Sequence, residues 1–567
     1  MALILRPAPP EDRRAEKRQS RAGDARERAR VYRRAVPTRQ RRAALRRLAP
    51  VATPDKLGAR DGDREAMLMR TRTTAETRRT GTRRTGTRTG TLTGALASAL
   101  AGLWLAGTAG AALAQEAGSP ALRPDQARFR ALYQELVETN TTLSSGSCTL
   151  AAERMAAHLK AAGIPAADLH LFSTPDHPKE GGLVAIYRGA DPKAKPILML
   201  AHLDVVEAKR EDWTRDPFKL VEEGGYFYGR GTFDDKAMAA TWVDTLVRYK
   251  QEGFRPRRTI KLALTCGEET NGAFNGAEYL AKTHRDLIDA AFAINEGGGG
   301  RLDAAGKPQF LGIQVGEKLS QNYTLEVTNP GGHSSRPLPD NAIYHLAGAL
   351  LKIQAYRFPV QFNDTTRDFF TRVAQIRPPE QRDAILALLA DPTNETARAL
   401  VERDPDANSI LHTNCVATLL DAGHATNALP QRARANINCR IFPGTSAEAV
   451  RQTLIETIAD PKVSVSIREV RNAPAPPPPL DPKVLGPAET LAAQMWPGVP
   501  QVRLMSAGAT DGAFLTPVGI PTYGISGMFT DPDGNGIHGL NERIRVKTLY
   551  EGRDYLYRLM KLYADAE

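Results

Sequence analysis

The chain has 567 residues, which is long enough for two or more domains with a sizeable core. Its formal net charge of +12 suggests a nucleic-acid partner at first. However, residues 1–114 hold 26 of the 76 Lys and Arg residues and only 10 of the 64 Asp and Glu residues, so the remainder carries 50 basic and 54 acidic side chains. Because the basic excess is confined to the N-terminal segment, the body of the chain has no charge-based reason to bind a phosphate backbone, and we expect no nucleic-acid partner.

The N-terminal segment divides into two parts. Residues 1–66 are rich in Arg and Ala and lack apolar periodicity, which indicates disorder. Residues 67–114 combine a basic stretch, an apolar run and the small residues Ala112 and Ala114, which is typical of a secretory signal peptide cleaved after Ala114. The alternative is a membrane anchor, but the run is rich in Ala and Gly and only weakly apolar.

We therefore expect an exported protein, periplasmic or secreted, with no stable membrane insertion after cleavage of the signal. Met67 or Met69 is a more ordinary start for such a signal than Met1, so residues 1–66 are hypothesised not to be translated.

From about residue 120, amphipathic helices alternate with short apolar strands, which predicts an α/β domain with a mixed, twisted central sheet flanked by helices. The helices are predicted at 128–139, 151–163, 236–253 and 274–286, and the strands at 181–189, 196–204, 226–231, 258–269 and 290–299.

After Gly300 the pattern changes to a β-α-β-β-α-β-like set, which predicts a small α+β ferredoxin-like domain. Its strands are predicted at 320–329, 413–420, 433–442 and 463–470, and its helices at 340–356 and 446–460. A polar helical stretch at 361–412, broken at Pro378–Pro379, is predicted to be an insertion. The Pro-rich stretch 473–482 cannot continue a strand and is predicted to be a linker.

The α/β pattern resumes after the linker and ends in a helix at 546–566. The domain organisation we expect is an α/β domain formed by residues 115–316 and 474–567, interrupted by a lid or dimerisation domain at 317–473. The four cysteines all lie after residue 114. Cys415 and Cys439 lie on two strand-like runs that a hairpin could join. In one interpretation they face each other and form a disulfide; in the other they are two small core residues.

The stretch "YGRGTFDDKAM" at 228–238 allows two interpretations. A Gly-x-Gly before a helix is able to cradle a phosphate, but no second element of a nucleotide-binding site follows it. The alternative is a tight glycine turn that aims one carboxylate at a metal ion.

Three predicted strands end in acids and a histidine: the first in His202 and Asp204, the second in Glu268 and Glu269, and the third in Asn295 and Glu296. Ligands of open α/β sheets gather at the carboxyl ends of the strands, so we expect these three ends to share one crevice. A buried carboxylate is costly unless it is paired or bound to a metal.

One histidine with several carboxylates is the donor set of Zn²⁺ or, less selectively, of Mn²⁺ or Co²⁺. Asp204 lies two residues after His202, so its side chain is expected to accept a hydrogen bond from the His202 ring and to fix its tautomer. His-x-Asp alone is more often a surface polar pair, but the conjunction of three strand ends favours a metal site.

Several motifs now carry a resemblance to a known family. They are "LAHLDVV", Trp213, "DPF" at 216–218, "YGRGTFDDK", "CGEE", "NEGG", "NPGGHSSRP" and "HGLNE", in this order. The chain resembles the co-catalytic zinc exopeptidases and amidohydrolases over residues 120–567. This family includes carboxypeptidase S, aminoacylase, glutamate carboxypeptidases, acetylornithine deacetylase and succinyl-diaminopimelate desuccinylase, and the wording of the motifs is most similar to the carboxypeptidase S branch.

The resemblance implies a zinc-exopeptidase fold and two zinc ions bridged by Asp234. His202 and Glu296 would complete the site of one ion, and Glu269 and His538 that of the other. The resemblance also implies that Glu268 is the general base. We count Asp204 with it as a catalytic residue because Asp204 is expected to orient the His202 ring. Asp235 would follow Asp234 through a strained peptide bond, with a cis bond as one alternative.

For substrate binding, the resemblance implies three further residues: His333, which donates to the scissile carbonyl oxygen and in dimeric members comes from the partner subunit, and Asn427 and Arg440, which bind the terminal carboxylate. The resemblance is therefore compatible with a homodimer. The expected function is hydrolysis of a peptide or N-acyl amide bond that releases an amino acid with a free carboxylate. The alternatives are a narrow N-acyl-amino-acid deacylase and a non-catalytic peptide-binding protein.

Overall fold

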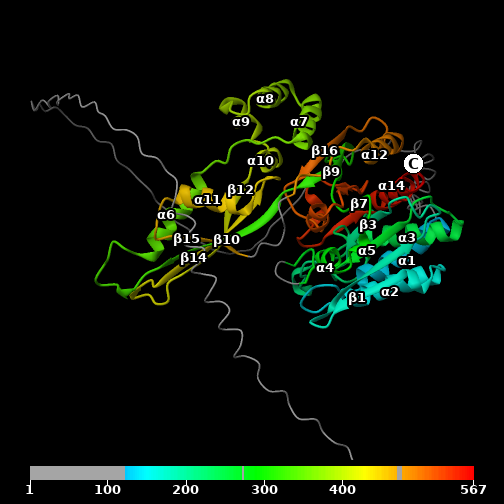
Figure 1. The fold of residues 1–567 in the computed structure, drawn as a ribbon, viewed down its shortest axis with the longest axis horizontal. Coiled ribbons are helices and arrows are strands. Elements are labelled where there is room, and N and C mark those ends of the chain that lie inside the picture. The colour runs from blue at the N-terminus through cyan, green and yellow to red at the C-terminus, as the bar shows by residue number, and fades with distance from the viewer. Residues whose placement is uncertain (1–121, 271–273, 469–474, 567) are drawn as a thin grey trace, which may run out of the picture. The chain divides into compact units, whose positions relative to one another are not determined.

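The computed structural model describes residues 122–270, 274–468 and 475–566 (Figure 1). The predicted disordered segment 1–66, the predicted signal peptide 67–114 and the first residues of the predicted linker lie outside this part of the chain. Within it, no helix combines the length and apolar character needed to span a bilayer.

The larger of the sheets has ten strands and is mixed, as predicted. Its order is β1 (Leu169–Thr174), β2 (His177–Tyr187), β6 (Ile260–Thr265), β3 (Ile197–His202), β7 (Phe292–Asn295), β17 (Thr522–Gly524), β9 (Pro308–Glu317), β8 (Gly299–Leu302) and β18 (Phe529–Thr530), with β16 (Gln501–Ser506) paired to β9. In the centre of this sheet, β3 runs parallel to both β6 and β7, so the carboxyl ends of these three strands meet at one edge.

Helices cover both faces of this sheet. They are α1 (Pro124–Glu138), α2 (Cys148–Ala161), α3 (Lys236–Glu252), α12 (Pro482–Met495) and α14 (Val546–Asp565) on one face, and α4 (Gly276–Thr283), α5 (Arg285–Ile288) and α13 (Gly512–Leu515) on the other. The division follows from the alternation of side chains along the strands. In β3, Met199 joins the cluster under the first set of helices, whereas Leu198 and Leu200 join the cluster under the second.

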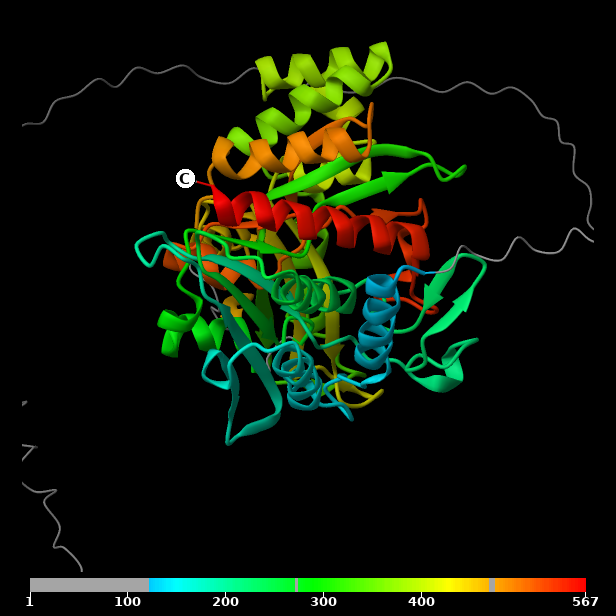
Figure 2. The same ribbon diagram turned by 90° about the vertical axis from the view of Figure 1, so that its right-hand side faces the viewer.

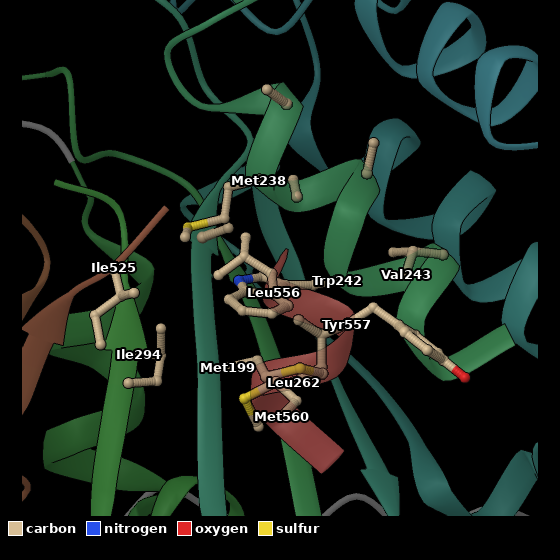
Figure 3. Close-up of a cluster of buried hydrophobic side chains, with 14 of the residues drawn as sticks. Met199, Met238, Trp242, Val243, Leu262, Ile294, Ile525, Leu556, Tyr557 and Met560 are labelled. Atoms are coloured by element: carbon tan, nitrogen blue, oxygen red, sulfur yellow. The ribbon is translucent and has the colours of Figure 1, made fainter. Parts of the chain in front are cut away.

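Figure 3 shows the first of these clusters at close range, where Met199 and Leu262 of the sheet meet Trp242 of α3 and Met560 of α14. Trp242 is fully buried, and its ring N–H donates to the main-chain oxygen of Leu200 at 3.1 Å, which satisfies the one polar atom of the ring. In Figure 2, α14 (red) runs alongside α12 (orange).

The second sheet has four antiparallel strands in the order β12 (Asn414–Ala422), β14 (Arg432–Ile441), β10 (Leu319–Thr328) and β15 (Ser464–Arg468), with α6 (Ala342–Ala355) and α11 (Ala447–Ile458) packed against it. The first strand, β10, lies between the third and the fourth, which is the predicted ferredoxin-like order. Alternate residues Tyr323, Leu325 and Val327 of β10 are fully buried against the helices. A short ladder of β11 (Gly332–His333) and β13 (Ala428–Leu429) accompanies this sheet.

The predicted helical insertion forms four helices, α7 (Asp364–Ile376), α8 (Pro379–Ala390), α9 (Glu395–Val401) and α10 (Pro405–Leu411). Asn363, Asn394 and Asp404 cap three of them with side-chain hydrogen bonds, and Pro379 occupies the first turn of α8, where its missing N–H has no cost. In Figure 1, α7 lies beside β16.

A third sheet contains β4 (Val221–Glu223), β5 (Tyr226–Tyr228) and β19 (Arg543–Arg545). The strand predicted at 226–231 therefore ends three residues early, because Gly229 and Gly231 adopt positive φ angles of 157° and 79° and turn the chain. Short 3₁₀ segments complete the fold at η1 (Ala166–Asp168), η2 (Arg210–Asp212), η3 (Thr516–Val518) and η4 (Gly534–Gly536).

Two disulfides cross-link the chain. Cys415 and Cys439 lie directly opposite each other in β12 and β14 and are bonded, so the disulfide interpretation holds. The second bond, between Cys148 and Cys266, was not predicted: it ties the first residue of α2 to the residue that follows β6, across a separation of 118 residues.

Candidate active site

The three predicted strand ends meet as expected. β3 ends at His202, β6 is followed by Glu268 and Glu269, and β7 is followed by Glu296. His202 is 1 % exposed, and its Nε2 lies 3.7 Å from the Glu296 carboxylate. One side chain of each strand end therefore faces a common crevice at the carboxyl edge of the sheet.

Asp234 lies between two imidazoles. Its Oδ1 is 3.0 Å from Nε2 of His202, and its Oδ2 is 3.1 Å from Nε2 of His538. Glu269 contacts the same nitrogen of His538 at 2.9 Å. The site thus has two halves that share one carboxylate: His202 and Glu296 on one side, and His538 and Glu269 on the other.

This donor set fits metal ions. His202, Asp234 and Glu269 each offer a donor atom within 4.8 Å of the others, and so do His202, Glu268 and Glu296. Imidazole nitrogens and carboxylate oxygens are the ligands that Zn²⁺ takes in proteins, and a shared carboxylate is suited to hold two ions close together.

The crowding of charge shifts the pKa values of the cluster. Burial lowers the pKa of His202, but the charge of Glu296 and the contacts with Asp204 and Asp234 outweigh it and raise this pKa well above its usual value. Contacts with Asp234 and Glu269 raise the pKa of His538 to about 10. Both shifts reflect the carboxylates that crowd the two imidazoles, and a metal ion would compete with protons for the same ring nitrogens.

Glu268 lies beside both halves. Burial, followed by the charge of Glu296, raises the pKa of Glu268 well above its usual value. Burial also raises the pKa of Glu296 to about 7. A buried carboxyl group with a raised pKa beside this donor set is suited to accept a proton.

Asp204 differs in detail from the prediction. The nearest acceptor for His202 Nδ1 is the main-chain oxygen of Asp204 at 3.0 Å, whereas the Asp204 carboxylate lies 3.6 Å away, too far for a hydrogen bond. The carboxylate instead accepts hydrogen bonds from the main-chain N–H groups of Glu269 at 3.0 Å and of Glu268 at 3.4 Å. Asp204 therefore positions the loop that carries both glutamates, and its carbonyl orients the ring.

The turn that presents Asp234 depends on a residue that was assigned no role from the sequence, Glu542. Its Oε1 accepts the main-chain N–H groups of Phe233 at 2.8 Å and Asp234 at 3.1 Å. Its Oε2 accepts Gly231 N–H at 2.9 Å and an Arg230 guanidinium nitrogen at 2.8 Å. Glu542 is 1 % exposed and lies about 310 positions further along the chain, so only its place in the motif "HGLNE" pointed to it.

The peptide bond between Asp234 and Asp235 is cis, which was one of the expected alternatives. At Gly231 an added Cβ would lie 2.7 Å from Val205 Cγ1, so both the positive φ and the lack of space select glycine there. The glycines of "YGRGTFDDK" thus serve a turn that aims one carboxylate.

A second residue that was not predicted, Asp511, anchors the glutamate loop from the other side. It is 1 % exposed and accepts hydrogen bonds from the Thr265 hydroxyl at 2.6 Å and the Asn275 amide at 2.7 Å. Asn275 in turn donates to the main-chain oxygen of Gly267 at 3.2 Å. The loop that carries Glu268 is therefore held at both its ends.

Of the three residues expected to bind substrate, Arg440 lies apart from His333 and Asn427. Arg440 lies opposite Ser320 at the start of β10, and the charge of Glu268 raises the pKa of Arg440 against the larger, lowering effect of burial. Arg440 is therefore close enough to the glutamate loop to interact with it electrostatically.

His333 and Asn427 lie elsewhere. The N–H of Ser334 donates to the Asn427 main-chain oxygen at 3.1 Å, which joins the two loops. Both loops follow the distal end of β10, ten residues after Leu319, or about 30 Å along a strand. Within the described parts of the chain, no hydrogen bond or ion pair links His333 to the crevice.

Comparison with known proteins agrees with this geometry. Residues 198–562 match the model of peptidase family M20/M25/M40. The human N-fatty-acyl-amino acid synthase/hydrolase PM20D1 is 30 % identical over 385 residues, which cover 66 % of this chain and 75 % of that protein. Carboxypeptidase S of Saccharomyces cerevisiae is 26 % identical over 291 residues, which cover 49 % of this chain and 50 % of that protein.

Among solved structures, the M20 family metallo-carboxypeptidase Sso-CP2 from Sulfolobus solfataricus superposes with a TM-score of 0.58 at 19 % identity, over 78 % of this chain and 100 % of that one. This likeness concerns the fold. The family match, which spans more than half of the chain, and the relatedness to PM20D1 go further: the chain belongs to peptidase family M20/M25/M40, whose members are metallopeptidases and amidohydrolases.

Proposed function

We propose that this chain is an exported di-zinc exopeptidase that hydrolyses a peptide or N-acyl amide bond and releases an amino acid with a free carboxylate. The observation that carries the proposal is the Asp234 carboxylate, which has one oxygen against each of two imidazoles, with Glu268 beside it. Mn²⁺ or Co²⁺ would suit the same donors less selectively.

Asp234 would offer one carboxylate oxygen to each of two ions. His202 and Glu296 would hold one of them, and His538 and Glu269 would hold the other. When bound, the ions lower the pKa of a water molecule and stabilise the negative charge that develops on the substrate.

The residues of the chain do the rest of the chemistry. The carboxylate of Glu268 takes the proton of the attacking water and passes it to the nitrogen of the leaving amine. Asp204 and Asp511 hold the loop of Glu268 so that this carboxylate needs little reorganisation. The guanidinium of Arg440 grips the terminal carboxylate of the substrate in a bidentate manner.

We further propose a homodimer in which His333 and Asn427 act in the crevice of the partner subunit. The support is the separation of these two residues from Arg440 within one chain, together with exposed apolar side chains on the same sheet and helix, Tyr344, Leu351 and Leu420, which are 70 %, 66 % and 67 % exposed.

A mixing experiment tests this dimer. Glu268→Gln and His333→Ala variants are prepared separately, dissociated and reassociated together. If the crevices are completed in trans, about one crevice in four of the mixture has both native residues and activity returns. If each variant is inactive and the mixture stays inactive, the proposal that the partner subunit completes the crevice is wrong.

We infer the substrate class from the names of two relatives. The human relative is named for N-fatty-acyl-amino acids and the yeast relative for a carboxypeptidase, and both names describe amide bonds to an amino acid with a free carboxylate. The second candidate is a deacylase of one N-acyl amino acid, favoured by the first of these names. A non-catalytic peptide-binding protein is disfavoured because every donor position and the base are filled.

The deciding experiment is a screen of dipeptides and N-acyl amino acids with the zinc-loaded protein. Glu268→Gln should keep its metal and lose about 10²–10⁴-fold in turnover. Glu153→Gln, a change at an exposed position of α2, is the matched control and should be unaffected. Absence of bound metal together with absence of chelator-sensitive turnover would support the peptide-binding alternative, and near-normal turnover by Glu268→Gln would refute the assignment of the base.

A further inference from the structure

The proposed general base lies on a short loop, residues 266–270, that directly follows β6. We call it the glutamate loop. Its first residue, Cys266, is bonded to Cys148, the first residue of α2. Only Gly267 separates this covalent tie from Glu268. The disulfide therefore holds the chain two positions before the proposed base, and the function proposed above gives it no part.

Gly267 makes the glutamate loop dependent on support from outside. Its φ of 96° lies in the left-handed region, and an added Cβ would lie 1.8 Å from the main-chain oxygen of Phe274, so glycine is required there. Glycine restricts its own φ and ψ angles less than other residues do, and it therefore passes little restraint from β6 to Glu268. The position of Glu268 thus depends on what the loop contacts.

The main-chain contacts of the two glutamates converge on Asp204. Its carboxylate accepts hydrogen bonds from the N–H groups of Glu269 at 3.0 Å and of Glu268 at 3.4 Å. The same carboxylate lies against the disulfide, because one of its oxygens and the sulfurs of Cys148 and Cys266 are within 4.8 Å of one another. All three of these residues are buried. The disulfide and the two main-chain hydrogen bonds therefore meet at one carboxylate.

The segment before Cys148 is joined to both neighbours of Asp204. The Thr141 hydroxyl donates to the main-chain oxygen of Leu203 at 2.7 Å, and the N–H of Val205 donates to the main-chain oxygen of Thr141 at 3.4 Å. The disulfide then ties this same segment to the glutamate loop. The three pieces of chain form a closed ring of contacts, with the disulfide as its covalent link.

Reduction of the disulfide changes two supports of the glutamate loop. The loop loses its covalent tie to α2. In addition, the two thiols carry S–H groups, which are weak hydrogen-bond donors, and an oxygen of Asp204 lies beside them. A thiol that donates to this carboxylate competes with the N–H groups of the loop for the same acceptor, whereas a disulfide has no hydrogen to donate.

We propose that the Cys148–Cys266 disulfide positions the base Glu268, so that the chain is an efficient catalyst only after these two thiols have been oxidised. This inference rests on the proposed function, because it concerns the base of the same site. The disulfide takes no part in bond cleavage. The reduced chain folds and keeps its metal donors, but its glutamate loop is displaced.

The oxidation is a thiol–disulfide exchange. The two protein thiols give two electrons and two protons to a small-molecule disulfide, which becomes two thiols while the S–S bond of the protein forms. Thiols stay reduced in the cytoplasm and are oxidised in extracytoplasmic compartments. An exported protein with this disulfide therefore gains its full activity after export.

The first test compares two matched double variants of the full chain. Cys148→Ala/Cys266→Ala removes the positioning disulfide, and Cys415→Ala/Cys439→Ala removes the other one. Each is assayed with saturating zinc, on the best substrate of the screen, well below its own unfolding midpoint. The first variant should keep its zinc and a KM within about three-fold of the native value but lose about 10–100-fold in kcat, as expected for a catalytic group displaced by about 1 Å. The control variant should keep its kcat within about three-fold.

The second test changes only the oxidation state of the pair. Cys415→Ala/Cys439→Ala protein is unfolded with dithiothreitol in denaturant and refolded with zinc, one half in dithiothreitol and the other half in a glutathione redox buffer. The two halves should have the same circular dichroism and zinc content. The half without free thiols should have a kcat about 10–100-fold higher than the half in which both thiols are free.

The outcomes separate this inference from the proposed function. Equal kcat values in the two oxidation states, or an equal loss of kcat in both double variants, overturn the inference and leave the proposed function standing. Loss of zinc or of folded structure in the reduced half also overturns it, because the disulfide then supports the fold as a whole. No hydrolysis of any amide in either oxidation state overturns the proposed function itself.

Discussion

Replacement of Glu542 by glutamine tests how the bridging carboxylate is held. Each carboxylate oxygen of Glu542 accepts two hydrogen bonds. The donors are Phe233 and Asp234 at one oxygen, and Gly231 and Arg230 at the other. Whichever way the new amide turns, its NH₂ group faces two donors, and both lose their acceptor. The substitution changes no volume, so the effect is electrostatic.

The expected magnitude follows from burial. The side chains of Arg230 and Glu542 are 3 % and 1 % exposed, and breaking a buried ion pair typically costs about 3–5 kcal/mol. For a folded region of roughly 450 residues, this corresponds to a fall in Tm of about 3–5 °C. Because the same hydrogen bonds fix Asp234, metal affinity should also fall by about 10–100-fold, as for other residues that orient a ligand.

The assay is thermal unfolding in the presence of a chelator, together with metal titration of the same variant. Glu222→Gln is the matched control, because Glu222 pairs with Arg130 at 2.9 Å but is 41 % exposed, and such a pair contributes about 1 kcal/mol at most. If Glu542→Gln unfolds within 1 °C of the native protein and binds metal equally well, our account of the glycine turn is wrong.

Three further predictions concern the crevice and the Cys148–Cys266 disulfide. First, contacts with Asp234 and Glu269 raise the pKa of His538 to about 10, so this ring must lose a proton to bind a metal ion near neutral pH. Metal affinity should therefore fall as the pH is lowered. Calorimetry in buffers of different ionisation enthalpy at pH 7 should show proton release on metal binding, whereas release of none contradicts the raised pKa. Second, Cys148→Ser removes the disulfide that closes a loop of 118 residues, so it should lower the free energy of unfolding by about 2–5 kcal/mol. The measurement is denaturant titration of the oxidised native protein and of the variant. Equal unfolding midpoints of the two would show that the disulfide does not contribute to stability. Third, Arg440→Lys should raise KM at least about 10-fold for substrates with a free terminal carboxylate and much less for their amides, because lysine lacks the bidentate fork; equal changes for both would argue against a carboxylate contact.

Much of the site could be predicted because its side chains are tied to local patterns. His202, Glu269 and Glu296 lie at or just after the ends of apolar strands, and parallel strands bring such ends to one edge whatever the rest of the fold does. The two glycines before Asp234 mark a turn by their own conformational freedom. The ferredoxin-like order likewise follows from the sequence of helices and strands.

The fold class, the candidate donor residues and their neighbours along the chain could therefore be inferred before the structure was known. The distant groups that hold these donors in place became visible only in the folded chain. Glu542 supports a turn 308 positions earlier, and Cys148 bonds to Cys266 across 118 positions. The carbonyl of Asp204, rather than its carboxylate, faces the ring of His202. Such pairings depend on how the elements pack, since a buried donor or acceptor takes whichever partner packing brings within about 3 Å, and no local periodicity records that choice.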